Sequence, residues 1–536
     1  MWQHDYSPIA GSLGLSALAA SLPIFVLLYL LGIRREPAWR AAISGLAAAV
    51  LLALAVYRMP VVPMLSSVAY GAAFGLFPIG WIVFWAIVLY RLTVDTGRFE
   101  VLKDSVGSLT DDRRLQALMI AFCFSGFVEG SAGFGTPVAV AAAMMTGLGF
   151  SPFHAAAICL LGNTAPVAFG SIGIPVVTLA RITSLPLQDL SGTVGRVLAP
   201  VAFLIPGYMV AVIGGWKGLK GVWPAALVCG ASFAATEYFV SNHLGPQLAG
   251  VLSGLVSMIV LAVLFRVWKP SNSFSMEGAS ATHTPGRHSF AETLLAWSPY
   301  LLLVVFVLTW GQDAIKAKLN AVNLVILWPG LHNLIERMPP VVAKASPYAA
   351  EFTLNWLSAA GTACMLATLA AAAVLRVSPL RYARIVAATW RQMSLSLVTI
   401  AAVLALAFLM NYSGATTTLG LAFAATGVLF PFFSAMLGWL GVFLTGSDTS
   451  SNALFGNLQV VTAGRLHLNP VLMASANCAG GVMGKMISLQ SIAVAAAATG
   501  MPASDEARLF RFTLGHSILL ASLLGGVTAL YAYVLR

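Results

Sequence analysis

Long apolar segments, separated by short polar ones, follow one another along almost the whole 536-residue chain. Hydrophobic residues make up 59% of it and charged residues 9%, and its mean hydropathy is +0.88. A soluble domain carries about 25% charged residues. Many of the apolar runs approach the roughly 20 residues that a helix needs to cross hydrocarbon. The pattern therefore predicts an all-α polytopic membrane protein.

Twelve of the apolar segments are long enough to be read as full crossings. We expect about twelve transmembrane helices, at residues 9–33, 41–57, 64–90, 153–180, 197–215, 222–240, 246–265, 293–311, 349–375, 393–411, 470–500 and 512–535. Two further segments, about 115–150 and 419–464, are interrupted near their middles by small polar residues. We expect each of these to be a re-entrant hairpin, which dips into the membrane and returns to the side it came from.

The positive charges test this arrangement, because cytoplasmic loops of membrane proteins carry an excess of Lys and Arg. If both hairpins return, one face holds loops 34–40, 91–114, 217–220, 266–292, 376–391 and 501–511, with 19 of the 29 lysines and arginines. That face is predicted to be cytoplasmic, with both termini outside. The same bias explains the net charge of +11 without a nucleic-acid partner. The five cysteines have no paired or metal-like spacing and are expected to be buried free thiols.

A Ser/Gly/Pro-rich stretch from Lys269 to Phe290 lies in the predicted cytoplasmic linker 266–292 and divides the chain into halves 1–265 and 293–536. In each half a hairpin is followed by a span that glycines and other small or polar residues interrupt. The first interruption is GNTAPVAFGSIGIP (Gly162–Pro175) and the second is ANCAGGVMGKMISLQS (Ala476–Ser491). The first hairpin enters from the cytoplasm and the second from outside. We therefore expect two inverted-topology repeats with discontinuous helices, which are typical of secondary transporters.

Three ionisable residues fall at membrane depth in this scheme. Glu129, in GFVEGSAGFGTP, is the only acid between Asp112 and Asp189. Asp448, in TGSDTSSN, and Lys485 are similarly isolated in the second half. Charges are costly in a bilayer, so such residues are candidates for function. The alternative is structural: Lys485 and Asp448 form an ion pair that neutralises two buried charges. Glu237, by contrast, is interpreted as a side chain that snorkels at an outer boundary.

Small and polar residues surround these charges. Glycines permit tight backbone reversal, and a helix that starts at membrane depth offers free N–H groups and a positive dipole end to an anion. The candidate substrate-binding residues of the first half are Ser131, Gly133, Gly135, Thr136, Asn163, Thr164 and Ser171. Those of the second half are Ser447, Thr449, Ser450, Asn452, Asn477, Lys485, Ser488 and Gln490. Alternatively, the amides and hydroxyls only cap broken helices or join spans.

Five stretches resemble one family of transporters: VEGSAGFGTPVAV, GNTAPVAFGSIGIP, TGSDTSSNALF, GGVMGKMIS and GLFPIGWIV. They are similar to the lactate permease family, which comprises bacterial inner-membrane L-lactate and glycolate permeases. The resemblance implies proton symport of small 2-hydroxymonocarboxylates (L-lactate, also D-lactate or glycolate), without a cofactor, in a chain that forms homodimers. It points to Glu129–Thr136, Asn163, Ser447–Asn452 and Asn477–Gln490. The sequence departs from the family at Leu489, where proline is expected between the serine and the glutamine.

The residues and the resemblance together give a mechanism to test. Free N–H groups and Lys485 hold the substrate carboxylate, while hydroxyls and amides bind its 2-OH group. Glu129 or Asp448 carries the proton, since burial favours the neutral form of a carboxyl and a nearby lysine opposes it. If Lys485 lies closer to Asp448, Glu129 is the better proton carrier, and we favour Glu129.

Two other classes of function stay open. A sodium-coupled carrier would use Asp448, Asn163, Asn477 and backbone carbonyls as ion ligands. An intramembrane enzyme is disfavoured, because the sequence contains no recognisable nucleophile–base constellation. We therefore expect no catalytic residues and no metal site.

Overall fold

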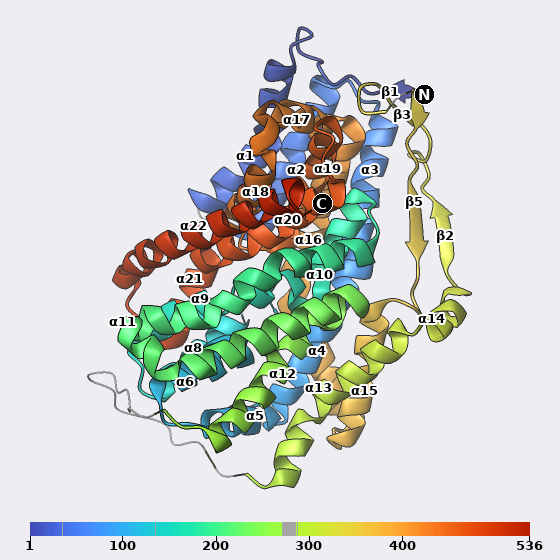
Figure 1. The fold of residues 1–536 in the computed structure, drawn as a ribbon. Helices are drawn as coiled ribbons and strands as arrows, with labels where there is room; N and C mark the ends of the chain where they lie inside the picture. The colour runs from blue at the N-terminus through green and yellow to red at the C-terminus, as the bar shows by residue number, and fades with distance from the viewer. Residues whose placement is uncertain (35, 134–135, 271–285, 287, 343, 536) are drawn as a thin grey trace.

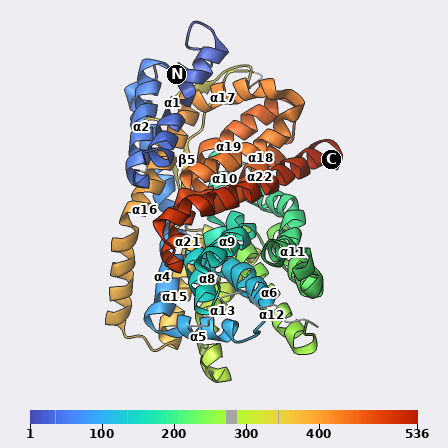
Figure 2. The same ribbon diagram turned by 90° about the vertical axis from the view of Figure 1, so that its left-hand side faces the viewer.

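The computed structural model describes residues 1–34, 36–133, 136–270, 286, 288–342 and 344–535. Helices dominate it, as the sequence predicted. The N-terminal helices pack against helices of the second half, so that α1 (Leu13–Gly32), α2 (Ala38–Ala55) and α3 (Val61–Phe74) lie beside α16 (Pro379–Ser413) and α17 (Ala415–Phe423) (Figure 1). Figure 2 shows α16 running along one side of the molecule. The two halves are therefore not separate bodies.

The remaining elements follow in chain order, with η marking short π- or 3₁₀-helical turns. Before the linker come η1 (Gly75–Gly80), α4 (Trp81–Asp95), α5 (Arg98–Gly107), α6 (Arg113–Gln116), η2 (Ala117–Phe124), α7 (Ser125–Ser131), α8 (Thr136–Gly147), α9 (Pro152–Gly162), η3 (Ala165–Phe169), α10 (Gly170–Thr183), α11 (Leu187–His243) and α12 (Pro246–Val267). After it come α13 (Phe290–Gly311), α14 (Asp313–Asn320), α15 (Ala360–Val374), η4 (Ala424–Leu429), α18 (Phe430–Thr445), α19 (Asp448–Arg465), α20 (Pro470–Gly484), η5 (Lys485–Ile487), α21 (Leu489–Thr499) and α22 (Ala503–Tyr533).

Within the described residues, ten helices are long and apolar enough to cross a membrane, or eleven if the bent pair Pro470–Ile487 and Gln490–Thr499 counts as one span. The expected set was about twelve transmembrane helices, so the protein is polytopic as predicted although the number of spans differs. The expected spans 197–215 and 222–240 both belong to α11, which turns back at Gly215 and Val222. Its two arms pack together, since Ser191 Oγ donates a hydrogen bond of 2.8 Å to the carbonyl of Ser241.

Two expected boundaries are wrong. Residues 349–375 were expected to be one span, but β5 (Glu351–Leu354) occupies its start and the helix α15 begins only at Ala360. The second hairpin was expected over 419–464, whereas its arms are α18 and α19, and α17 is a separate helix before them. In both cases apolar composition ran on past a change of backbone direction, such as that at Gly427 (φ +56°).

Five short strands were not predicted. β1 (Trp2–Gln3) pairs in parallel with β3 (Ile335–Arg337), which pairs antiparallel with β4 (Ser346–Pro347), and β2 (Leu324–Leu327) pairs antiparallel with β5. They lie together beside the N-terminus (Figure 1). His4, next to β1, bonds through Nε2 to the carbonyl of Tyr412 at 2.8 Å. The N-terminal segment is thus fixed to the end of α16.

Side-chain contacts join several loops of the predicted cytoplasmic set to one another. Asp95 pairs with Arg381 at 2.6 Å, and Asp104 pairs with His288 at 2.9 Å, which joins the ends of α4 and α5 to the starts of α16 and α13. Arg114 donates to the carbonyl of Gly218 at 3.3 Å. These segments all belong to the set of loops that the charge bias predicts to be cytoplasmic. The expected linker, 266–292, lies mostly outside the described residues.

The first hairpin folds back on itself as expected. Arg113, at the start of α6, donates to the carbonyl of Leu148, just after α8, so both ends of the segment meet. In the second hairpin Ser451 Oγ donates to the carbonyl of Gly438 at 3.1 Å, which joins α19 to α18. The order of hairpin, interrupted helix and long helix occurs twice along the chain. The inversion of one half relative to the other stays a prediction.

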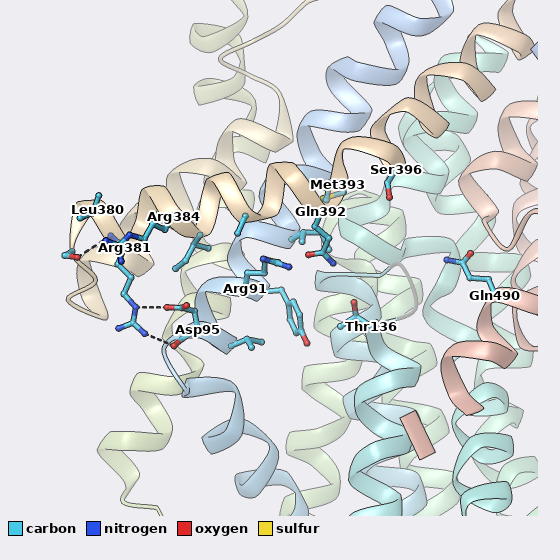
Figure 3. Close-up of a pocket in the computed structure, with 16 residues that line it drawn as sticks. Arg91, Asp95, Thr136, Leu380, Arg381, Arg384, Gln392, Met393, Ser396 and Gln490 are labelled. Carbon is cyan, nitrogen blue, oxygen red and sulfur yellow. Dashed lines mark hydrogen bonds and ion pairs between the residues drawn. The ribbon is translucent and has the colours of Figure 1, made fainter. Parts of the chain in front are cut away.

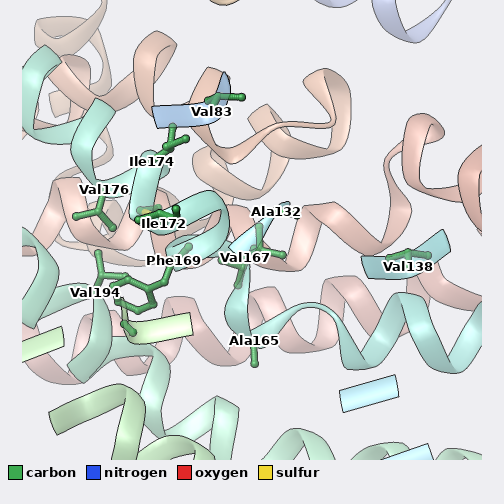
Figure 4. Close-up of a cluster of buried hydrophobic side chains, with 14 of the residues drawn as sticks. Val83, Ala132, Val138, Ala165, Val167, Phe169, Ile172, Ile174, Val176 and Val194 are labelled. Atoms are coloured by element: carbon green, nitrogen blue, oxygen red, sulfur yellow. The ribbon is translucent and has the colours of Figure 1, made fainter. Parts of the chain in front are cut away.

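Buried apolar side chains surround the first interrupted helix. Phe169, Ile172 and Ile174 are at most 1% exposed and lie in one cluster with Ala132 of the first hairpin (Figure 4). Ser171, Ile172 and Gly173 have φ between +46° and +72°, and this left-handed conformation is unfavourable for a β-branched residue. Tight packing therefore holds the backbone in a strained turn at the centre of the protein.

Candidate functional site

Glu129 lies on α7, against the break between α9 and α10. Its Oε2 accepts a hydrogen bond of 2.9 Å from Asn163 Nδ2, and Asn163 Oδ1 accepts one of 2.8 Å from Ser125. A methyl group on Gly170 would lie 2.7 Å from Glu129 Oε1. The carboxylate is thus buried against backbone, with Asn163 at the C-terminal cap of α9 as its polar partner.

The tip of the first hairpin is attached to the same break. Ser171 Oγ donates a hydrogen bond of 2.9 Å to the carbonyl of Ala132. Gly133 has φ +59°, and its Cα lies so close to the Ser171 hydroxyl that a side chain would collide with it. The tip can make this approach only with glycine. The predicted residues Gly133, Asn163 and Ser171 therefore come together around Glu129.

The second hairpin repeats this attachment with a cation. Lys485 follows α20, and its Nζ donates a hydrogen bond of 2.6 Å to the carbonyl of Gly446 at the hairpin tip. Ser488 then caps α21, because its Oγ accepts from the N–H of Ser491 at 3.2 Å. The helix bends by 42° between Ile487 and Gln490, so the break is kept although Leu489 replaces the expected proline.

Asp448 begins α19, directly after this tip, and is 3% exposed. Its Oδ2 lies 3.1 Å from the Cys478 thiol and 3.5 Å from Asn452 Nδ2. Its Oδ1 has no hydrogen-bond partner among the described residues. One oxygen of a buried carboxyl is therefore left to bind a proton or a cation.

Amide side chains connect the two halves. Asn452 Nδ2 donates to the carbonyl of Pro175 in α10 at 3.2 Å, and Asn452 Oδ1 accepts from Asn477 Nδ2 at 2.9 Å. Asn477 Oδ1 in turn accepts from Gln459 at 3.0 Å. The second hairpin is in this way bonded to the broken helices of both halves.

The three charges interact without a direct ion pair. Lys485 has electrostatic interactions with both Glu129 and Asp448. In the part of the chain that the structure describes, neither carboxylate lies within 4.0 Å of the Lys485 ammonium. The structural alternative, a closed Lys485–Asp448 ion pair, is therefore absent from this conformation. Nor do the described residues contain a group of three His, Cys, Asp or Glu side chains that could hold a metal ion.

The other predicted residues fall into three sets. Ser131 and Thr164 donate to carbonyls of their own helices, at 3.0 Å and 2.8 Å, which is a local role. Thr449 and Ser450 are half-buried, Ser447 caps α19, and neither Thr449 nor Ser450 makes a side-chain hydrogen bond to another described residue. Thr136 and Gln490 both line a cavity (Figure 3). Gly135 lies outside the described residues.

Several contacts of the site were not anticipated. Ser125 and Gln459 anchor the amides, and Cys478, expected to be only a buried thiol, contacts Asp448. No sequence pattern marks them, because each contact joins residues far apart in the chain. The interpretation of Glu237 is wrong: its side chain does not snorkel to the surface but is fully buried, and neither oxygen has a hydrogen-bond partner among the described residues.

A polytopic helical membrane protein whose buried charges gather where hairpin tips meet interrupted helices belongs to the class of membrane transport proteins. Comparison with known sequences narrows this class. Residues 16–535 match the family model described as L-lactate permease, so the chain belongs to the L-lactate permease family.

Full-length relatives agree with this assignment. The chain is 44% identical to the glycolate permease GlcA of Escherichia coli K12, over 99% of this chain and 98% of that protein. It is 43% identical to an L-lactate permease of Salmonella typhimurium, over 100% and 99% of the two chains. It is 44% identical to an L-lactate permease of Bacillus subtilis, over 99% of both. Among solved structures, MtrF of Neisseria gonorrhoeae has a TM-score of 0.48 and 12% identity, over 88% of this chain and 84% of that one.

Proposed function

We propose that the protein takes up small 2-hydroxymonocarboxylates, L-lactate and also D-lactate or glycolate, by proton symport with alternating access. The names that its full-length relatives carry, L-lactate permease and glycolate permease, support this substrate class. We place the protein in the bacterial inner membrane, with both termini extracytoplasmic, because the basic loops group on one face. A homodimer is part of the proposal through the family resemblance.

The observation that carries the proposal is the state of Lys485. This buried ammonium hydrogen-bonds a carbonyl at the second hairpin tip and has no carboxylate within ion-pair distance among the described residues. A buried cation is costly unless it is paired, so it is poised to pair with an anionic substrate. The free N–H groups at the starts of α8, α19 and α21 add positive ends close by. Thr449 and Ser450, whose hydroxyls are uncommitted within the described chain, would bind the 2-OH group.

Proton coupling follows from the charge balance of the site. Adding one carboxylate anion together with one proton leaves the formal charge of the buried site unchanged between its empty and loaded forms. An uncoupled anion would instead add a full charge at membrane depth, which is prohibitive. One of the two buried carboxyls, Glu129 or Asp448, would carry the proton.

The geometry shifts our preference from Glu129 to Asp448. The Asn163 amide already donates a hydrogen bond to Glu129 Oε2. Asp448 Oδ1, in contrast, has no hydrogen-bond partner among the described residues and is therefore available to a proton.

Counterflow tests the substrate class. Purified protein in liposomes loaded with unlabelled L-lactate should concentrate labelled L-lactate transiently, and external glycolate or D-lactate should compete, whereas acetate, which lacks the 2-OH group, should compete weakly. Absence of counterflow with all three hydroxy acids would refute the proposed function.

Sodium is the second candidate for the coupling ion. Asp448 Oδ1, which has no partner among the described residues, is the kind of oxygen ligand that hard cations prefer. Uptake driven by an inward sodium gradient at equal internal and external pH would support it. Uptake driven by a pH gradient in sodium-free buffer supports the proton.

A further inference from the structure

A cavity of about 1030 Å³ lies between α4 and α16 on one side and the starts of α8 and α21 on the other. Thr136 and Gln490 form its inner side, Arg381 and Arg384 lie toward its outer end, and Arg91 lies between them (Figure 3). The volume is at the upper end of the range of small-molecule sites, about 300–1000 Å³. It is therefore too large to be a fitted site for a three-carbon acid and has the size of an entrance.

The charges of this wall favour anions. Asp95 is paired with Arg381, so the pair contributes no net charge. Arg91 and Arg384 have no ion-pair partner among the described residues. Arg91 is half-buried, and Arg384 is exposed. Two uncompensated guanidinium groups in one concave wall concentrate small anions and raise their rate of encounter.

One face of α16 connects the arginines to the inner side. Arg384, Ala388, Gln392 and Ser396 all line the cavity, and their four-residue spacing places them on the same face of the helix. At the inner end Gln490 packs closely against Gly446, because a methyl group added to this glycine would lie only 2.7 Å from Gln490 Oε1. Gly446 is also the partner of Lys485. The cavity thus leads from free arginines to the hairpin tip that the buried lysine contacts.

We propose that this cavity is the cytoplasmic vestibule of the carrier, and that Arg91 and Arg384 recruit the carboxylate anion there before it reaches or after it leaves Lys485. The inference rests on the proposed function for the identity of the anion. The loops beside the cavity, at the end of α4 and the start of α16, both belong to the set predicted to be cytoplasmic.

Kinetics from the two faces of the membrane test the vestibule. In the double variant Arg91→Gln/Arg384→Gln, the KM for lactate presented from the cytoplasmic face should rise by about tenfold at low ionic strength, an electrostatic effect. The KM from the opposite face should stay within about twofold, and the difference should shrink at high salt. The matched control is Arg376→Gln/Arg391→Gln, which removes the same charge from the loops predicted to be cytoplasmic, outside the cavity lining. Equal effects of the two double variants, or an equal change on both faces, would overturn the proposal.

A second measurement does not depend on lactate transport. The native cysteines are all buried. Gln392→Cys therefore introduces one thiol that a labelling reagent is expected to reach only through the cavity. An anionic methanethiosulfonate should label it from the cytoplasmic face faster than a cationic one, and Arg91→Gln/Arg384→Gln should reverse this preference. Labelling from the opposite face, or no preference for the anion, refutes the vestibule. If Gln392→Cys labels as expected but the wild type shows no counterflow, the proposed function is refuted instead.

Discussion

Lys485 Nζ donates a 2.6 Å hydrogen bond to the carbonyl of Gly446, which fixes the tip of the second hairpin to the break between α20 and α21. The first half has the corresponding contact between Ser171 Oγ and the carbonyl of Ala132, at 2.9 Å. The two attachments differ in charge: one donor is a hydroxyl and the other an ammonium. A substrate carboxylate can compete for the ammonium, so only the second attachment is expected to change when substrate binds.

Replacing Lys485 by Met keeps a long apolar side chain and removes the charge. Because hydrogen bonds to charged groups contribute about 1.5–3 kcal/mol, the KM for lactate should rise by roughly tenfold to a hundredfold. Uptake into proteoliposomes measures this, with Lys344→Met as a control at an exposed lysine. An unchanged KM in Lys485→Met would return the lysine to a structural role.

The Asn452–Asn477 bond is predicted to be energetically coupled. Each single substitution to Ala leaves the partner amide buried without its bond, and such interhelical bonds contribute about 0.6 to 1.7 kcal/mol in membranes. The double variant should therefore lose less stability than the sum of the singles, by a similar amount. Unfolding free energies in micelles provide the measurement, and Asn452→Ala combined with the distant Thr528→Val serves as the additive control. Full additivity at positions 452 and 477 would contradict the bond.

Gly173 should not tolerate a side chain. Its φ is +72°, and a methyl group there would lie 2.6 Å from the carbonyl oxygen of Pro246. The left-handed conformation alone costs about 1–2 kcal/mol for alanine, so Gly173→Ala should lower the thermal unfolding temperature and the yield of folded protein. Gly526→Ala, in open space on the helix α22, should be neutral or stabilise by up to about 1 kcal/mol. Equal behaviour of the two variants would mean that the turn at Gly173 is wrong.

The docking of the N-terminal segment onto the protein should become less stable in mild acid. Burial lowers the pKa of His4 to about 4, with a further contribution from Arg337, against an ordinary value of 6.5. The undocked segment then binds more protons than the docked one between pH 6.5 and 4, so docking is fully stable above pH 6.5 and loses up to about 3 kcal/mol as the pH falls to 4. Thermal unfolding at pH 7.5 and 5 should show a larger loss for the wild type than for His4→Gln, whereas exposed His467→Gln should behave like the wild type. A loss in His4→Gln equal to that of the wild type would contradict this.

The sequence was sufficient for the features that hydrophobicity and isolated charges encode. The hairpins, the two breaks and the proximity of Lys485 to the second hairpin tip follow from apolar length, glycine and solitary polar residues. The double crossing within α11 was also anticipated, because Lys217 and Lys220 mark its turn.

Features that depend on contacts between distant segments were not predictable. β5 (Glu351–Leu354) lies at the start of an expected helical span, and its pairing with the apolar strand β2 decides its conformation. Glu237 lies near the end of an apolar run, and only the packing of α11 against its neighbours buries it. Likewise, the contact between the Cys478 thiol and Asp448 exists only in the folded chain, so the sequence around Cys478 does not indicate it.

The central claim is tested most directly by lactate accumulation in two variants, in each of which a neutral amide replaces one buried carboxyl. Wild type, Asp448→Asn and Glu129→Gln are reconstituted in liposomes, and lactate uptake against its own gradient is measured under an imposed inward pH gradient without sodium, alongside counterflow. Asp448→Asn should retain counterflow and lose pH-driven accumulation, whereas Glu129→Gln should retain both. If both variants accumulate lactate as the wild type does, neither buried carboxyl carries the proton and the coupling mechanism is wrong.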